Sequence, residues 1–170
     1  MANKNDIKSV FAILLSEDGR SFLLVKRRDV SVWVFPGGGI EEGETREAAC
    51  LRELEEETGL SCQIVKKVGD YNHDWIIPVK ASVFLCRRVS GTPKITAETR
   101  DIAFFPIDAP PRHLLSVFKE FLDYALDKSP NPAPKLRSVN FGSALKFLFY
   151  NPLFLFRTLT NRCRLLLSHN

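Results

Sequence analysis

The sequence lacks any apolar run that approaches the roughly 20 residues needed to span a bilayer. Its N-terminus, MANKNDIKSV, lacks the apolar core of a secretory signal, so we expect a cytoplasmic protein. The four cysteines, at positions 50, 62, 86 and 163, have neither metal-ligand nor redox spacing. We therefore expect reduced thiols rather than a disulfide framework or a zinc site.

Three further absences are informative: two concern binding motifs and one concerns charge. Three consecutive glycines, at positions 37 to 39, are not followed by Gly-Lys-Ser or Gly-Lys-Thr, which argues against a nucleotide-binding P-loop. Neither His73 nor His113 has a neighbour at metal-ligand spacing, and we interpret both as structural or exposed. Acidic residues are absent from Lys128 to Asn170, where seven basic residues occur, so all 20 acidic residues lie upstream of this segment.

The residues that are present predict one α/β domain over residues 1–127. The chain has 170 residues and is 45% hydrophobic, enough to bury a core. Asp18-Gly19 indicates a hairpin turn between two early strands. Thr45 can cap a helix that ends at Gly59. The full pattern predicts strands at 10–15, 21–28, 33–35, 60–68, 79–87 and 102–107, and helices at 45–58 and 112–127.

The C-terminal part differs in composition from this domain. Residues 128–138 (KSPNPAPKLRS) contain three prolines and are typical of a linker. Residues 139–170 are apolar and basic, and Asn151-Pro152 favours the start of a helix. Packing on the domain or on a partner chain, as in a homodimer, is one reading of this tail. Contact with an anionic membrane surface is a second, and disorder or nucleic-acid contact a third. Although nucleic-acid contact is among these readings of the tail, we do not expect nucleic acid as a partner of the protein.

A cluster of carboxylates occurs inside the first predicted helix. Eight acidic residues lie between Glu41 and Glu57. Glu53, Glu56 and Glu57 share one helical face, within an arc of roughly 100°. Like charges at this spacing repel each other and destabilise a helix, so we infer that a cation binds there. Carboxylate oxygens are hard ligands, which suit Mg²⁺ or Mn²⁺ better than zinc.

The stretch that contains this helix reads GGIEEGETREAACLRELEEETGL. It matches the pattern G-x5-E-x7-R-E-U-x-E-E-x-G-U, where U is aliphatic, at every specified position. The chain therefore resembles the Nudix hydrolases, and the MutT-type members most of all. The resemblance extends over roughly residues 5–127 and does not cover the tail. The matching residues are Gly38, Glu44, Arg52, Glu53, Leu54, Glu56, Glu57, Gly59 and Leu60.

The resemblance implies a fold and a reaction. The implied fold is an α/β/α sandwich around a mixed β-sheet, here with a helical C-terminal extension. The implied reaction is hydrolysis of a diphosphate linkage, in which Mg²⁺ joins protein carboxylates to substrate oxygens and lowers the pKa of a bound water. We expect Glu53, Glu56 and Glu57 to bind the metal, and the resemblance adds the backbone carbonyl of Gly37. Mn²⁺ is an alternative metal.

The general base is a separate question, because it is not one fixed residue in this family. MutT-type enzymes use a loop glutamate just before a late strand as a ligand or base. Glu98, in TAETRDIAFFP, occupies this place, with Asp101 as its rival. An ordinary exposed loop acid is the remaining alternative. Glu53 is the first candidate for the base, and Glu98 is the second.

Three arginines are candidates for supporting roles. Arg52 cannot bind a metal, and we expect it to orient Glu44 or Glu56 by pairing with it; a surface ion pair is the alternative. Arg27 and Arg28 end a strand near the glycines, where they can bind substrate phosphate or simply remain solvated. The candidate substrate-binding residues are Arg27, Arg28, Gly38 and Glu44, and the candidate catalytic residues are Glu53, Glu98 and Arg52.

The substrate is only weakly indicated by the sequence. By elimination we expect a small nucleotide, a nucleoside triphosphate. Alternatives are ADP-ribose, a dinucleoside polyphosphate or a nucleotide sugar, or a non-catalytic nucleotide-binding module, although no carboxylate of the pattern is missing. Phe35, Tyr71 and Trp75 are candidates for stacking on a base, and packing in the core or at its rim is the alternative for each.

Overall fold

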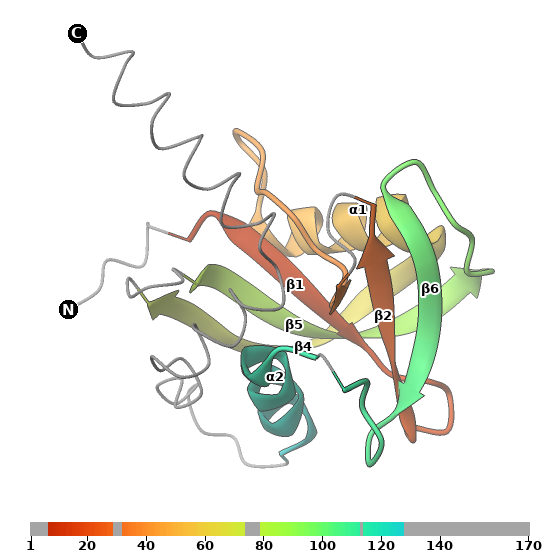
Figure 1. Ribbon diagram of the computed structural model, residues 1–170. Helices are drawn as coiled ribbons and strands as arrows, with labels where there is room; N and C mark the ends of the chain where they lie inside the picture. Colours follow the sequence, from red (N-terminus) through yellow and green to blue (C-terminus); the bar gives the residue numbers. More distant parts are fainter. Residues whose placement is uncertain (1–6, 29–31, 74–78, 113, 128–170) are drawn as a thin grey trace, which may run out of the picture.

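The computed structural model describes residues 7–28, 32–73, 79–112 and 114–127. Figure 1 shows the strands and helices that these residues form. The predicted linker at 128–138 and tail at 139–170 lie outside the described residues, as does His113. In chain order the elements are β1 (Ser9–Leu14), β2 (Ser21–Arg27), β3 (Trp33–Val34), α1 (Arg46–Thr58), β4 (Leu60–His73), β5 (Val79–Gly91), β6 (Thr99–Pro106) and α2 (Ser116–Leu126).

The strands form two three-stranded sheets. In the first, ordered β1-β5-β4, β1 runs parallel and β4 antiparallel to β5, so this sheet is mixed. In the second, ordered β3-β2-β6, all pairs are antiparallel. An isolated bridge between Leu15 and Phe22 links β1 to β2, and Gly19 takes a φ of 67° in the predicted turn between them. The predicted fold class is confirmed, with its strands divided between two sheets.

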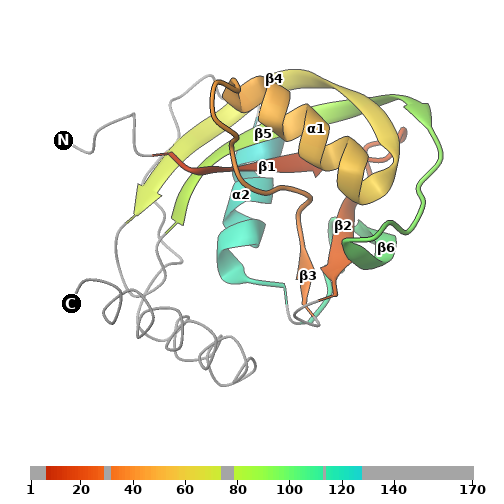
Figure 2. The ribbon, with the colours of Figure 1, turned by 90° about the horizontal axis from the view of Figure 1, so that it is seen from above.

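The two helices cover opposite faces of the mixed sheet (Figures 1 and 2). Side chains alternate between the two faces of a strand. Along β1, Ala12 therefore joins the cluster under α1, whereas Ile13 joins the cluster under α2. α1 contributes Ala49, Cys50 and Leu54, and α2 contributes Phe118, Phe121, Leu122 and Ala125.

Both ends of α1 follow from its sequence. The Thr45 side chain accepts a hydrogen bond from the amide of Ala48 at 3.1 Å, which caps the first turn. Gly59 has a φ of 71° and donates its amide to the carbonyl of Glu55 at 2.7 Å, which ends the helix. The predicted helix is confirmed at both ends. α2 begins at Ser116, four residues later than predicted. Neither helix in the described part of the chain is long and apolar enough to cross a membrane.

β4 and β5 are longer than predicted, since they continue to His73 and Gly91. Gly69 and Asp70 follow directly after the predicted end of β4 at residue 68, and both residue types are depleted in strands, so the sequence pattern ends that strand early. The pairing of β4 with β5 contains three register shifts, and a bulge changes which side chains face the core. The two strands pair with each other from Leu60 with Gly91 to His73 with Val79, so their length follows from this pairing and not from the local apolar pattern.

Candidate functional site

The glycine-rich loop after β3 lies directly against β1. The amide of Val10 donates to the carbonyl of Gly38 at 2.9 Å. A Cβ at Gly37 would overlap the carbonyl oxygen of Val10 and come within 2.9 Å of the Cα of Phe11. Only glycine at position 37 therefore lets the loop approach β1 this closely.

The same loop contacts two carboxylates of α1. The amide of Gly37 donates a hydrogen bond to Oε2 of Glu57 at 2.9 Å. A Cβ at Gly38 would overlap the carboxylate of Glu53, so the absence of a side chain leaves the space that this carboxylate fills. The loop thus holds two of the three predicted metal ligands beside the predicted carbonyl ligand, that of Gly37.

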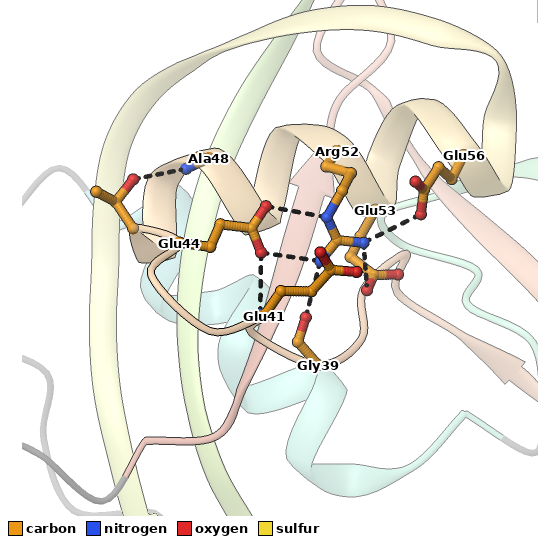
Figure 3. Close-up of polar contacts among 8 residues, drawn as sticks. Gly39, Glu41, Glu44, Ala48, Arg52, Glu53 and Glu56 are labelled. Atoms are coloured by element: carbon orange, nitrogen blue, oxygen red, sulfur yellow. Dashed lines mark hydrogen bonds and ion pairs between the residues drawn. The ribbon is translucent and has the colours of Figure 1, made fainter.

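Arg52 connects α1 to the loop before it (Figure 3). Its Nε and Nη2 donate to the two oxygens of Glu44 at 2.9 and 3.0 Å. Its Nη1 donates to Glu53 and Glu56, both at 3.0 Å, and Nη2 also donates to the carbonyl of Gly39 at 2.9 Å. A guanidinium has five N–H donors, and all of them are used here. The structure thus shows Arg52 paired with both expected partners, Glu44 and Glu56, and adds Glu53 and Gly39.

Burial and charge give these carboxylates different pKa values. Glu57 is 6% exposed, and burial raises its pKa to about 7; the hydrogen bond from Gly37 opposes this shift and the charge of Glu53 adds to it. Burial also raises the pKa of Glu53, although Arg52 opposes it. The hydrogen bond from Arg52 lowers the pKa of Glu44. Glu53 and Glu57 are both buried and repel each other, and a bound cation would reduce this repulsion.

A cavity of about 470 Å³ joins α1 to the other predicted site residues. Four segments line it: the glycine loop, α1, the end of β2 and the loop before β6. The lining residues are Arg27, Arg28, Gly37, Gly38, Gly39, Glu53, Glu57, Ala97 and Glu98. Three predicted site residues, Glu44, Arg52 and Glu56, lie outside this lining, and Arg52 links them to Glu53. The Glu56 side chain is 50% exposed.

The two rival loop acids occupy different places. Glu98 lines the cavity. Asp101 is exposed in β6, outside the lining, and its Oδ1 accepts a hydrogen bond from the amide of Ile102 at 2.9 Å. Nη2 of Arg28 donates to the carbonyl of Thr96 at 3.3 Å, so this arginine reaches the loop that carries Glu98. Placement therefore favours Glu98 over Asp101.

Two of the aromatic candidates for base stacking lie in the core. Phe35 is fully buried and Tyr71 is 3% exposed, both in the cluster under α2. The ring centroids of Tyr71 and Phe121 are 4.5 Å apart. The alternative of core packing is therefore correct for both residues, because α2 covers them. Trp75 lies outside the described residues.

Among the described residues, no three His, Cys, Asp or Glu side chains converge into a ready-made metal cluster. The contacts explain this, since Arg52 holds Glu53 and Glu56 while the amide of Gly37 holds Glu57. The donors nevertheless fit a hard divalent cation. The three side-chain donors are carboxylates, two of them are buried, and burial raises the pKa of both.

Sequence reasoning missed one buried residue of this region. Thr99 is fully buried, and its hydroxyl donates to the carbonyl of Glu57 at 3.2 Å. The one available signal was its position directly after Glu98. A threonine at the start of a strand is ordinary, so that signal does not distinguish this role from simple packing.

The sequence matches the family model described as NUDIX domain over residues 6–124. A MutT-like protein of Streptomyces ambofaciens is 31% identical over 130 residues, which cover 76% of this chain and 81% of that protein. An ADP-ribose pyrophosphatase of Methanocaldococcus jannaschii is 31% identical over 114 residues, 64% of this chain and 68% of that protein. The chain spans less of other curated relatives, including 42% of the length of two of them.

Solved structures share this architecture. A crystal structure of an ADP-ribose pyrophosphatase from Streptococcus suis has a TM-score of 0.60 and 26% sequence identity. The match covers 75% of this chain and 96% of that chain.

Proposed function

This chain belongs to the Nudix domain family, and we propose that it hydrolyses a diphosphate linkage in a nucleoside diphosphate-linked compound. One observation carries the proposal: the carboxylate residues Glu53, Glu57 and Glu98 line the same cavity as two arginines, Arg27 and Arg28. Its volume of about 470 Å³ lies in the range typical of pockets for small ligands. Acidic and basic groups in one pocket suit a substrate that carries both phosphate and a bound cation.

Mg²⁺ is the proposed cofactor, with Mn²⁺ as the alternative. Glu53, Glu56 and Glu57 would hold it, together with the carbonyl of Gly37. When bound, a divalent cation neutralises charge on phosphate oxygens and lowers the pKa of a bound water. Binding requires Glu53 and Glu56 to share their oxygens between Arg52 and the cation, and it requires Glu57 to be ionised.

The remaining residues have roles that their contacts suggest. Arg27 and Arg28, which line the cavity, bind the phosphate groups of the substrate. Arg52 positions carboxylates on both sides of itself and touches no substrate. Glu53 or Glu98 accepts the proton of the attacking water, because both line the cavity.

A nucleoside triphosphate is the proposed substrate, and one diphosphate linkage is hydrolysed in each turnover. ADP-ribose is the second candidate, because a relative that covers 64% of this chain carries the name ADP-ribose pyrophosphatase. Other relatives are named RNA pyrophosphohydrolase, although they align over shorter stretches. Nucleoside triphosphates and ADP-ribose both contain the diphosphate linkage that the proposed chemistry cleaves.

A substrate panel tests this proposal. The purified protein is incubated with nucleoside triphosphates, ADP-ribose, dinucleoside polyphosphates and nucleotide sugars in the presence of Mg²⁺, and products are separated by chromatography. We expect hydrolysis that EDTA abolishes and that added Mg²⁺ or Mn²⁺ restores. Full activity in excess chelator would overturn the metal assignment. Nucleotide binding without any turnover would favour a non-catalytic binding module.

A further inference from the structure

The loop between β5 and β6 is fastened to the C-terminal end of α1. The amide of Lys94 donates to the carbonyl of Thr58 at 2.9 Å. The hydroxyl of Thr99 donates to the carbonyl of Glu57 at 3.2 Å. The last carbonyls of a helix have no hydrogen-bond partners within the helix. Here Lys94 and Thr99 supply partners for two of these carbonyls. The position of the loop is therefore set by the helix that carries Glu53, Glu56 and Glu57.

Thr99 makes several of the hydrogen bonds that fix this loop. It is fully buried, and its Oγ1 accepts the amide of Thr96 at 3.1 Å. The two threonine hydroxyls also lie 3.3 Å apart. As the first residue of β6, Thr99 pairs with Arg27 of β2, where the ladder shifts register. Through its hydroxyl, Thr99 thus joins α1 to the loop, and through its backbone pairing it joins both to the end of β2. Each of these three segments lines the cavity.

Glu98 lies directly beside this anchor. Its amide faces the hydroxyl of Thr96 at 3.4 Å, and its peptide neighbour is Thr99. An exposed carboxylate on a free loop would lose conformational entropy each time it was brought to the substrate. Anchoring the backbone on both sides removes much of that loss in advance.

We propose that Thr99 is a positioning residue, whose buried hydroxyl holds Glu98 in place relative to the carboxylates of α1. This inference rests on the proposed hydrolase function and on the participation of Glu98 in it. Thr99 itself contacts no substrate, and it acts only through the backbone that it anchors. A hydroxyl that merely stabilised the fold would change stability without changing the contribution of Glu98 to the rate.

Valine is the closest replacement without a hydroxyl, and serine restores the hydroxyl. We expect Thr99→Val to lower kcat by about ten- to a hundredfold, with little change in KM, because a displaced catalytic group slows the chemical step. Thr99→Ser should recover most of that loss. Ser82→Ala is the matched control, since Ser82 is also fully buried and donates its hydroxyl to Asp70 at 2.6 Å, away from the cavity. It should lower stability and leave kcat near wild type.

A double-mutant cycle separates positioning from general destabilisation. If Thr99 acts through Glu98, then Thr99→Val should cost little further activity once Glu98→Gln is present. An equal fold loss in both backgrounds would overturn the inference.

Amide hydrogen exchange gives a readout that does not depend on activity. The amide of Thr96 donates to Thr99, so Thr99→Val should make it exchange faster, while Thr99→Ser and Ser82→Ala leave it near wild type. Unchanged exchange at Thr96 in Thr99→Val would overturn the anchoring role. Absence of hydrolysis in the wild-type protein would instead overturn the proposed function and the catalytic part of this inference, and faster exchange would still support the anchor.

Discussion

The amide of Gly37 donates a hydrogen bond of 2.9 Å to the carboxylate of Glu57, which joins the glycine loop to the last turn of α1. This bond places a buried carboxylate beside three consecutive glycines, which have no side chains to block access to it. It also makes the position of Glu57 depend on how closely the loop can approach β1. The first two predictions address the two partners of this bond.

Gly37→Ala should destabilise the protein and lower activity. The new Cβ would overlap the carbonyl oxygen of Val10, which belongs to the backbone and cannot rotate away. The loop must therefore shift, and we expect a loss of about 1–3 kcal/mol in the free energy of unfolding. Gly39→Ala is the control, because a Cβ there meets nothing within 4 Å. Urea denaturation of both variants measures the difference, and equal stabilities would contradict the close approach at Gly37.

Glu57→Gln should lower kcat by about a hundredfold or more, because it removes one buried anionic oxygen while it keeps the size of the side chain. It should also weaken Mn²⁺ binding, measured by titration calorimetry, with the circular dichroism spectrum unchanged. Glu55→Gln is the control on the same helix, since Glu55 is exposed and does not line the cavity. Wild-type rates and Mn²⁺ affinity in Glu57→Gln would show that this face of α1 does not bind the metal.

The metal-free protein should lose stability as pH rises. Glu57 has a pKa of about 7 in the folded chain, against an ordinary value of 4.5. Between these values the folded state holds a proton that the unfolded state has released, so the free energy of unfolding falls with rising pH. The part due to Glu57 is at most about 3 kcal/mol and is fully lost above pH 7.

Urea denaturation in the presence of a chelator, repeated across this pH window, measures that slope. Glu57→Gln should flatten it, because glutamine does not titrate. A slope that is the same in the wild type and in Glu57→Gln would contradict the raised pKa of Glu57.

Glu98→Gln and Asp101→Asn should have unequal effects. Glu98 lines the cavity, whereas Asp101 bonds to the amide of its own neighbour Ile102. We expect Glu98→Gln to lower kcat strongly and to change the pH profile of kcat, and Asp101→Asn to remain near wild type. Steady-state kinetics across pH distinguish them. The reverse ranking would transfer the role to Asp101, and two small effects would leave Glu53 as the general base.

Much of this site could be predicted because its signals are local. The cap at Thr45, the stop at Gly59 and the spacing of Glu53, Glu56 and Glu57 are all encoded within one helix and its ends. Helical periodicity then places the three carboxylates on one face before any long-range contact exists. The strand pattern likewise indicated the α/β class, because buried strands carry continuous apolar runs.

Other features depend on contacts between residues far apart in the chain. The register shift in the β2–β6 pair determines which residue of β6 meets Arg27, and the β4–β5 pair contains three further shifts. Bulges arise from pairing and leave no clear mark in a single strand. For the same reason, the burial of Phe35 and Tyr71 under α2 was not decided by the sequence pattern.

Local sequence thus specified the helix, its caps and its row of carboxylates, since those depend on neighbours within about one or two turns. Tertiary structure decided that Glu98, and not Asp101, lines the cavity, and that Arg52 uses all its donors on four partners. It also decided that Glu57 is buried with a raised pKa. The physical reason is that burial and charge depend on distances between separate elements, which only the packing of the loops against α1 and β1 establishes.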